Sequence, residues 1–419
     1  MSYIPFIRAN ARFIAFGFLA AAFSSFGQTF FIGLFGAEIR NAFALSHGGF
    51  GTIYLLGTVG SAATMVWSGR LIDRFDLRGF TVVVCVGLVA ACFVMGAAST
   101  VLALGVAIYM LRLTGQGLMS HIAITAMARY FETGRGKAIS LASMGHPAGE
   151  AVLPVLTVGV IALLGWRATW FAAGILLGLV LIPLVLFLLK GHEERHRRYV
   201  ESRKSMDASA RSGDWTVSEV LRDPRFAMIV PGMMAPSFIV TGFFFHQAQL
   251  VESKGWSMTW FATTFVAYAV ATVIASFLAG PVVDRLGALR VMPFFLLPMG
   301  CALLFLAGVD APWAALAFMV VAAMTTGAGH PITGAVWAEA YGVTHIGAIR
   351  SLHHALMVFS TALSPAAMGL LMDGGVTLES IALLCVAWVL AGSVLMAIAA
   401  RRFDFSNRES GPDSSSASG

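Results

Sequence analysis

Two titratable side chains lie four residues apart in an apolar stretch of this sequence. His146 and Glu150 would share one face of a helix there, because residues at i and i+4 are neighbours on a helical surface. A carboxyl group in a low-dielectric setting can hold a proton at neutral pH, and histidine titrates in the same range. We therefore predict that Glu150, together with His146, binds and releases a coupling proton. The structural alternative is a paired Glu150 that only holds helices together.

Polar side chains in other apolar stretches are candidates for binding a small-molecule substrate. The six candidates are Gln28, Arg112, His121, His246, Gln249 and His330. Such groups are hard to leave unpaired in hydrocarbon, so each needs a partner or a ligand. For Arg112 the alternative is a structural role, bonded to backbone carbonyls, and for the histidines it is packing. The phenylalanines around Gln28 and His246 favour a pocket for a flat or partly apolar solute.

Enzymatic and cofactor motifs are missing from the sequence. There is no phosphate-binding loop, nucleophile elbow, HExxH motif or dinucleotide fingerprint. The four cysteines form no Cys-x-x-Cys pair, which argues against a metal site and a disulfide framework. We expect no enzyme, no cofactor, no metal and no direct use of ATP.

The composition sets the class of protein that must position these groups. Hydrophobic residues make up 58% of the 419 residues and charged residues 11%, and the mean hydropathy is +0.82. A soluble domain carries about a quarter charged residues, so the composition indicates a multi-pass membrane protein. Charged or turn-rich breaks then divide the chain into twelve candidate helices. They cover residues 12–37, 48–68, 80–98, 101–127, 138–164, 168–189, 225–251, 258–281, 291–309, 312–336, 349–372 and 376–400.

The basic residues predict the orientation of these helices. With the N-terminus in the cytoplasm, all but four of the 27 Lys and Arg residues fall on cytoplasmic segments. The exceptions are Arg40, Arg167 and Lys254 outside and Arg112 within a helix. This positive-inside pattern predicts that both termini are cytoplasmic. The net charge of +6 is therefore topological and does not indicate nucleic-acid binding. The preference for Arg over Lys and the short loops indicate a bacterial inner membrane, and we expect a monomer in the lipid bilayer.

The two sets of six helices carry an internal repeat. One constant sequence offset relates Gly69 to Gly280, Asp73 to Asp284 and Ser46 to Ser257. Both serines precede a helix and are expected to cap it. The repeat predicts two parallel six-helix halves, residues 1–190 and 225–402. Residues 191–224 would form a cytoplasmic central loop, and residues 403–419 a disordered cytoplasmic tail.

The repeated motif resembles the signature loop of the major facilitator superfamily. Its two copies are Gly69-x-x-x-Asp73-Arg74 and Gly280-x-x-x-Asp284-Arg285, and the resemblance extends from about Arg12 to Arg402. It implies that these six residues form a conformational latch, and that the fold is an all-α membrane protein of twelve transmembrane helices working by alternating access. A finer resemblance, to the monocarboxylate and oxalate–formate branch, lies in Arg112, Gly115, Gly117, Pro154 and the segment 165–167.

These observations favour a secondary active transporter of a small organic metabolite. Arg112 and the finer resemblance favour an organic anion such as a monocarboxylate, moved in symport with a proton or another ion. The uncharged stretch 258–280 and the Phe-rich, Gln-containing stretches favour the alternative, a neutral or aromatic solute such as a vitamin (for example riboflavin) or a drug for efflux. A non-transporting membrane sensor is the third alternative.

Overall fold

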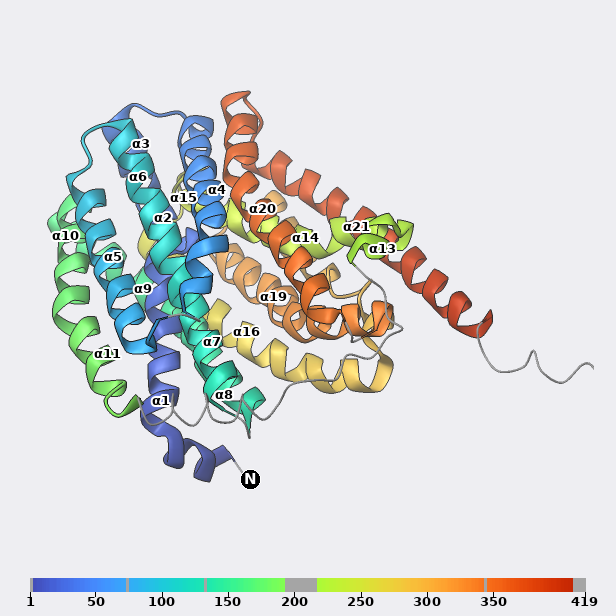
Figure 1. Cartoon of the computed structure of the whole chain (residues 1–419). Coiled ribbons are helices and arrows are strands. Elements are labelled where there is room, and N and C mark those ends of the chain that lie inside the picture. The colour runs from blue at the N-terminus through green and yellow to red at the C-terminus, as the bar shows by residue number, and fades with distance from the viewer. Residues whose placement is uncertain (1–2, 73–74, 132–133, 193–216, 343–344, 410–419) are drawn as a thin grey trace, which may run out of the picture. The chain divides into compact units, whose positions relative to one another are not determined.

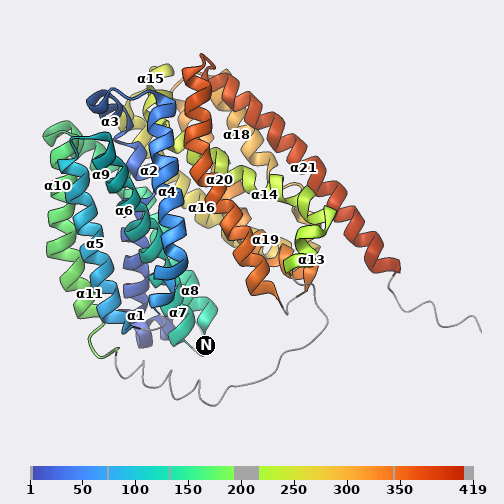
Figure 2. The same ribbon diagram turned by 45° about the horizontal axis from the view of Figure 1, so that its top comes forward.

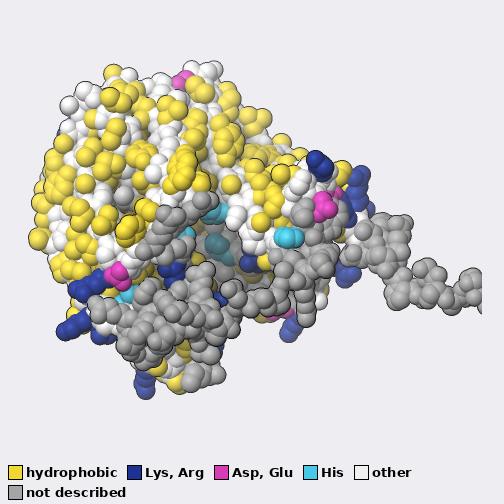
Figure 3. Space-filling view, viewed as in Figure 1, with side chains coloured by type: hydrophobic (Ala, Val, Ile, Leu, Met, Phe, Trp, Pro, Cys, Tyr) yellow, Lys and Arg dark blue, Asp and Glu magenta, His cyan; other side chains and the backbone are white. Residues whose placement is uncertain are grey.

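The computed structural model describes residues 3–72, 75–131, 134–192, 217–342 and 345–409, and every regular element in these ranges is helical (Figure 1). Eleven helical segments of this part of the chain are long and apolar enough to cross a membrane, and one further apolar helix is shorter. Hydrophobic side chains cover much of the face shown in Figure 3, as expected where lipid replaces water. The expected all-α membrane fold is confirmed.

Contacts between residues divide the chain into two compact units. Unit 1 comprises residues 1–209, 241–270 and 361–377, and unit 2 comprises residues 210–240, 271–360 and 378–419. The predicted halves of the sequence thus differ from the contact units, because parts of helices from the second half pack within unit 1. The predicted central loop lies largely outside the described residues, which resume at residue 217.

Unit 1 contains the α-helices of the first half, the 3₁₀ and π-helical segments that interrupt them, and α15 from the second half. They are α1 (Tyr3–Phe23), the 3₁₀ turn η1 (Ser24–Gly27), α2 (Thr29–Gly33), α3 (Gly36–Phe43), α4 (His47–Leu71), α5 (Leu77–Ala97), α6 (Val101–Leu111), the π-helical segment η2 (Arg112–Met119), α7 (Ser120–Tyr130), α8 (Arg135–Ser143), α9 (Gly145–Leu164), α10 (Trp166–Leu176), the π-helical segment η3 (Leu177–Leu181), α11 (Ile182–Leu188) and α15 (Gln247–Ser253). Within this unit α5 packs beside α10 and α11 (Figure 2).

Unit 2 and the helices shared between the units complete the chain. Unit 2 holds α13 (Val217–Arg222), α17 (Ala288–Val291), α18 (Leu297–Gly308), α19 (Trp313–Tyr341) and α21 (Leu378–Glu409). Three helices contribute a segment to each unit: α14 (Pro224–Phe245), α16 (Met258–Leu286) and α20 (Ile346–Asp373). Within unit 2, α18 packs against α19 and α21. Helix α21 extends beyond Arg402, where the tail was expected to begin, and residues 410–419 lie outside the described ranges.

The two serine caps predicted from the repeat are confirmed. Ser46 Oγ accepts a hydrogen bond from the Gly49 amide at 3.0 Å, at the start of α4. Ser257 Oγ accepts one from the Trp260 amide at 3.1 Å, at the start of α16. Each bond satisfies an amide that has no partner within its own helix.

The first expected span, 12–37, is not one continuous helix. Helix α1 ends at Phe23, η1 follows, and Gln28 has an extended backbone with φ −80° and ψ 154°. Ser24 Oγ donates to the Ala21 carbonyl at 2.7 Å, which is the local bonding by which serine competes with helix geometry. The break places backbone polar groups of Ser24–Gly27 inside the unit, where all four residues are buried.

The expected span 291–309 also differs from the structure. Helix α18 begins only at Leu297, after a turn over residues 292–296. Pro293 and Pro298 explain the late start, because proline has no amide hydrogen to donate and fits best in the first turn of a helix, where Pro298 lies. The next amide, that of Met299, instead donates to Thr325 Oγ1 on α19 at 3.0 Å.

Candidate functional site

The break in the first span crosses the π-helical segment of the fourth span at very close range. A Cβ atom on Gly27 would overlap the Leu111 carbonyl, and one on Gly115 would lie 2.7 Å from the Gly27 amide nitrogen. Only glycine at both positions lets the two backbones approach in this way. The 3₁₀ turn η1 and the π-helical segment η2 therefore form a single crossing, and π-helical turns often occur at functional sites.

Arg112 secures this crossing from within η2. Its Nη1 donates to the Gly27 carbonyl at 3.0 Å, and its guanidinium carbon lies 5.1 Å from the centre of the Tyr54 ring. Tyr54 in turn shares a 2.5 Å hydrogen bond with Thr29, the first residue after the break. Arg112 is 1% exposed, and its Nε and Nη2 atoms have no hydrogen-bond partner among the described residues. This geometry matches the structural alternative, an arginine bonded to a backbone carbonyl.

Helix α9 packs on the other side of the break. Gly145 and Gly149 allow α9 to approach the break closely. A Cβ on Gly145 would lie 2.8 Å from the Ala22 amide nitrogen, and one on Gly149 would overlap Ser25 Oγ. His146 Nδ1 lies 3.3 Å from Ser24 Oγ, within hydrogen-bond distance.

Glu150 lies one turn beyond His146 on the same helix. It is half-buried, and no hydrogen bond or ion pair joins it to any residue that the structure describes. In particular, no ion pair joins it to Arg112. A half-buried ionisable group of this kind is a candidate functional residue.

Two other predicted binding residues of unit 1 lie near the break or farther along the fourth span. Gln28 is the half-buried residue with extended backbone that ends η1. His121 on α7 lies 3.4 Å from Thr125 Oγ1 through Nδ1, and its Nε2 would lie 3.8 Å from a Cβ atom added at Gly69 on α4. His121 is therefore placed beside a glycine of the expected latch.

His246 and Gln249 belong to a second polar region of unit 1, at the junction of α14 and α15. His246 is 4% exposed, and its Nε2 lies 2.9 Å from the Pro365 carbonyl. Gln249 and His246 line a small pocket together with Arg40 and His47. The fully buried Gln247 donates to the Phe30 carbonyl at 2.7 Å and so ties α15 to α2. Gln247 belongs to the Phe-rich, Gln-containing stretch that the sequence marks as a possible pocket wall, but the sequence does not reveal its partner on α2.

Asp373 caps helix α4 from the end of α20, and sequence reasoning missed this residue. Its two carboxylate oxygens accept from the amides of His47 and Gly48 at 3.0 and 2.9 Å. Arg40 Nη1 donates to His47 Nε2 at 3.1 Å. Partial burial lowers the pKa of the Arg40 guanidinium, whereas Glu252 and Asp373 favour its charged form. The basic-residue pattern predicts that Arg40, and with it His47, Asp373 and Glu252, lie on the side of the membrane opposite the cytoplasm.

His330, the remaining predicted binding residue, lies in unit 2. It occupies α19 beside Pro331, and its side chain is exposed. No hydrogen bond joins it to a residue of the described ranges.

The expected latch residues are only partly described. Asp73 and Arg74 lie outside the described residues, and Gly69 is buried on α4. In the second copy Asp284 and Arg285 are exposed at the end of α16. The carboxylate that caps the next helix there is Glu339, which accepts from the Ala288 amide at 2.6 Å and the Leu289 amide at 3.4 Å. The sequence patterns did not identify Glu339.

Fold and site together define a multi-pass membrane transporter rather than an enzyme. The family model of the Major Facilitator Superfamily matches residues 17–267 and 240–416. The chain belongs to this superfamily, and the family resemblance inferred from the repeated loop is confirmed. Membership implies that the chain transports a small-molecule substrate.

Comparison with individual proteins agrees with this assignment. The chain is 25% identical over 315 residues to the uncharacterised MFS-type transporter YcxA of Bacillus subtilis (strain 168), a match that covers 73% of this chain and 74% of that protein. Among solved structures it resembles a bacterial homologue of the human lysosomal transporter Spinster. In its inward-facing and occupied conformation the TM-score is 0.62 at 16% identity, covering 95% and 97% of the two chains. In the unoccupied conformation the TM-score is 0.61 at 16% identity, covering 94% and 96%. These structures share the fold.

Proposed function

We propose that the chain is a proton-coupled secondary transporter of a small organic metabolite and that Glu150 carries the coupled proton. The observation that supports this most directly is the half-buried Glu150 carboxyl group, which has no partner among the described residues. It lies one turn from His146, which contacts the break in the first span at Ser24. Protonation of Glu150 can therefore change the polarity of the wall where a helix is already interrupted.

For the solute we propose an organic anion such as a monocarboxylate. Arg112 supports this class, because two of its nitrogens are buried without a hydrogen-bond partner in the described part of the chain, and a guanidinium binds carboxylates in a two-pronged geometry. In the conformation described it is 1% exposed, so a carboxylate would reach it only after the crossing of η1 and η2 loosens.

A neutral or aromatic solute is the second candidate. The break in the first span supports it, since Ser24, Gln28 and His146 offer neutral donors and acceptors beside Phe23 and Phe26, whose rings stack 6.2 Å apart. A thermal-shift panel of carboxylates and of neutral heterocycles decides between the two classes, because a ligand of the folded state raises its apparent stability.

The proton role is tested with Glu150→Gln in proteoliposomes, using the solute that gives the largest thermal shift. Uphill uptake driven by a pH gradient should be lost, while exchange of labelled for unlabelled solute should persist. Exchange requires no net proton movement, so a permanently neutral side chain still permits it. Glu38→Gln, which neutralises another half-buried carboxyl group on α3, serves as the matched control and should retain both activities. Gradient-driven uptake that survives in Glu150→Gln would contradict the proposal.

A further inference from the structure

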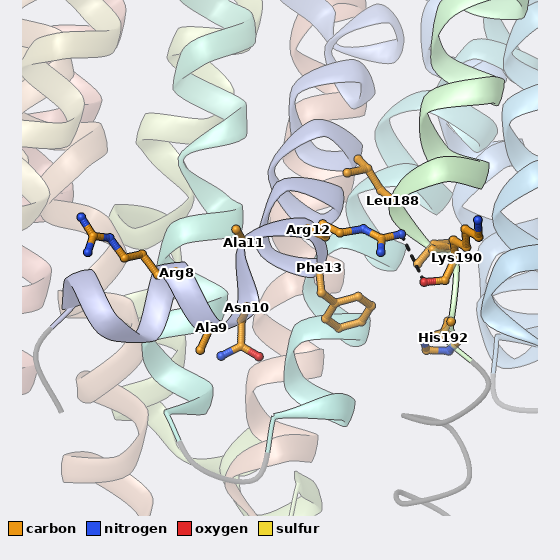
Figure 4. A pocket seen from close by; sticks show the side chains of 11 residues that line it. Arg8, Ala9, Asn10, Ala11, Arg12, Phe13, Leu188, Lys190 and His192 are labelled. Atoms are coloured by element: carbon orange, nitrogen blue, oxygen red, sulfur yellow. Dashed lines mark hydrogen bonds between the residues drawn. The ribbon is translucent and has the colours of Figure 1, made fainter.

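A basic pocket lies where the start of α1 meets the end of α11 (Figure 4). Its volume is about 300 Å³, and its lining includes Arg8, Arg12, Lys190 and His192. No acidic residue occurs in the lining that the structure describes. The pocket is separate from the break in the first span, and the transport function assigns it no role.

An irregular backbone at Asn10 creates one wall of this pocket. Asn10 has φ −126° and ψ 15°, which interrupts α1, and Figure 4 shows the segment bearing Arg8 running across the direction of the rest of the helix. The segment is held in place, since Asn10 Nδ2 donates to the Phe6 carbonyl at 3.2 Å and Phe6 packs on Phe131 with ring centres 5.4 Å apart.

Arg12 is oriented by the end of α11. Its Nη2 donates to the carbonyls of Phe187 at 2.5 Å and Lys190 at 3.2 Å, and its guanidinium lies 5.2 Å from the centre of the Phe187 ring. Its Nε and Nη1 atoms form no hydrogen bond with the described residues. A fixed guanidinium with two remaining donors suits a phosphate, which accepts such paired bonds.

The surroundings combine positive charge with exposed apolar surface. Arg8, Arg12 and Lys190 are exposed. The side chain of Phe187, whose ring lies under the Arg12 guanidinium, is 59% exposed, and that of Ile4, one turn before Arg8 on α1, is 65% exposed. A soluble anion would gain nothing from contact with this apolar surface, whereas an acyl chain can pack against it.

We propose that this pocket binds the headgroup phosphate of an anionic phospholipid. The basic-residue pattern predicts that the pocket lies at the cytoplasmic surface, where basic pockets between spanning helices bind anionic headgroups. Arg12 and Lys190 contact the phosphate, Arg8 adds charge from the crosswise segment, and the acyl chains lie along Phe187.

Native mass spectrometry of the full chain, titrated with phosphatidylglycerol or phosphatidylcholine, tests the proposal. Phosphatidylglycerol should bind more tightly. Each cation removed should weaken its binding by about five-fold, so Arg8→Gln/Lys190→Gln should lose about 25-fold. The matched control is Arg78→Gln/Arg290→Gln, which removes two exposed cations from elsewhere on the basic side and should leave the affinity unchanged.

Arg12 provides the sharper variant pair. Arg12→Lys keeps the charge but removes the two-pronged donor, so it should retain part of the preference that Arg12→Gln loses. Equal weakening in the control double variant would show general surface attraction and overturn the proposal. Inorganic phosphate that displaces phosphatidylglycerol at comparable concentrations would also overturn it, because the acyl chains would then contribute nothing. Neither result depends on transport, so the proposed function is tested separately.

Discussion

Two helix starts in this protein are capped by a carboxylate from a distant helix. Asp373 accepts from the first amides of α4, and Glu339 accepts from the first amides of α17. The chemistry is the same, since each carboxylate satisfies two amides that lack partners in their own helix. The origin of the partners differs: Asp373 lies 326 residues from His47, in the other predicted half, whereas Glu339 lies 51 residues from Ala288, in the same half.

This difference predicts which contacts break during transport and which persist. We expect the two predicted halves of the sequence to rearrange relative to one another, and a bond between them should then form in one state only. A bond within one half can survive the whole cycle. We therefore expect loss of the Asp373 cap to shift the balance of states, and loss of the Glu339 cap to lower stability. Four substitutions test this distinction.

Gly369→Ala should have the largest effect. A Cβ at this position would lie 2.5 Å from the His47 carbonyl oxygen, directly at the helix start that Asp373 caps. Overpacking of this kind costs about 2 kcal/mol and should force α4 and α20 apart. The labelling rate of Ala248→Cys, which lines the adjoining pocket, should rise about 30-fold in a Cys301→Ser background. Gly159→Ala on α9, where an added Cβ meets nothing within 4 Å, is the control, and equal rates in both would refute the expected separation.

Glu339→Ala should act on unfolding instead. Loss of two charge-assisted bonds to α17 should lower the free energy of unfolding by about 1.5 kcal/mol, while labelling of Ala248→Cys stays unchanged. Thermal unfolding in detergent measures the first effect. Asp284→Asn, an exposed member of the signature motif, is the control for a nearby lost charge. An unchanged unfolding temperature in Glu339→Ala would mean that water replaces the cap at no cost.

Asp373→Asn should raise the labelling rate with little effect on the unfolding temperature, and the rise should be smaller than in Gly369→Ala. The side chain is exposed, so its cap is worth about 1 kcal/mol, and labelling of Ala248→Cys should rise about five-fold. The unfolding temperature should change little, because the conformations that lack this bond remain folded. A drop in unfolding temperature without faster labelling would show that the Asp373 cap, like the Glu339 cap, contributes to stability and does not shift the balance of states.

Arg40→Gln should have the smallest effect. Arg40 is half-buried and contacts His47 through one hydrogen bond, so its loss should shift the balance of states by about 0.5 kcal/mol, roughly two-fold in labelling rate. High salt should reduce the difference between wild type and variant, since Glu252 and Asp373 act on Arg40 through charge. An effect equal to that of Asp373→Asn would indicate that the arginine, not the cap, holds this end together.

Local sequence patterns predicted what depends on local physics. The apolar stretches identified the spans, and Ser46 and Ser257 were recognised as caps because a cap lies within three residues of its target. The prolines that delay the start of α18 are visible in the sequence, but the apolar stretch 291–309 predicted an earlier start. Arg112 was identified by the cost of burying its charge.

Long-range partners could not be predicted in this way. Nothing in the sequence near residue 47 identifies Asp373, and nothing near Arg112 identifies the Gly27 carbonyl, since both pairings depend on how helices cross. In the structure the partner of Arg112 is a backbone carbonyl at the break in the first span, and the sequence alone does not reveal that break.

The π-helical segment η2 also affects how the fourth span can turn. A π-helical turn holds about one residue more than an α-helical turn, and one residue corresponds to about 100° around the helix axis. Conversion of η2 to regular α geometry would therefore rotate α7 relative to α6 by that angle, with the Arg112–Gly27 bond as the fixed point. The rotation would swing His121 away from Gly69, on the helix that leads into the first signature loop. A change between π-helical and α-helical geometry in the middle of the fourth span would therefore rotate the side chains of α7 to face different neighbours.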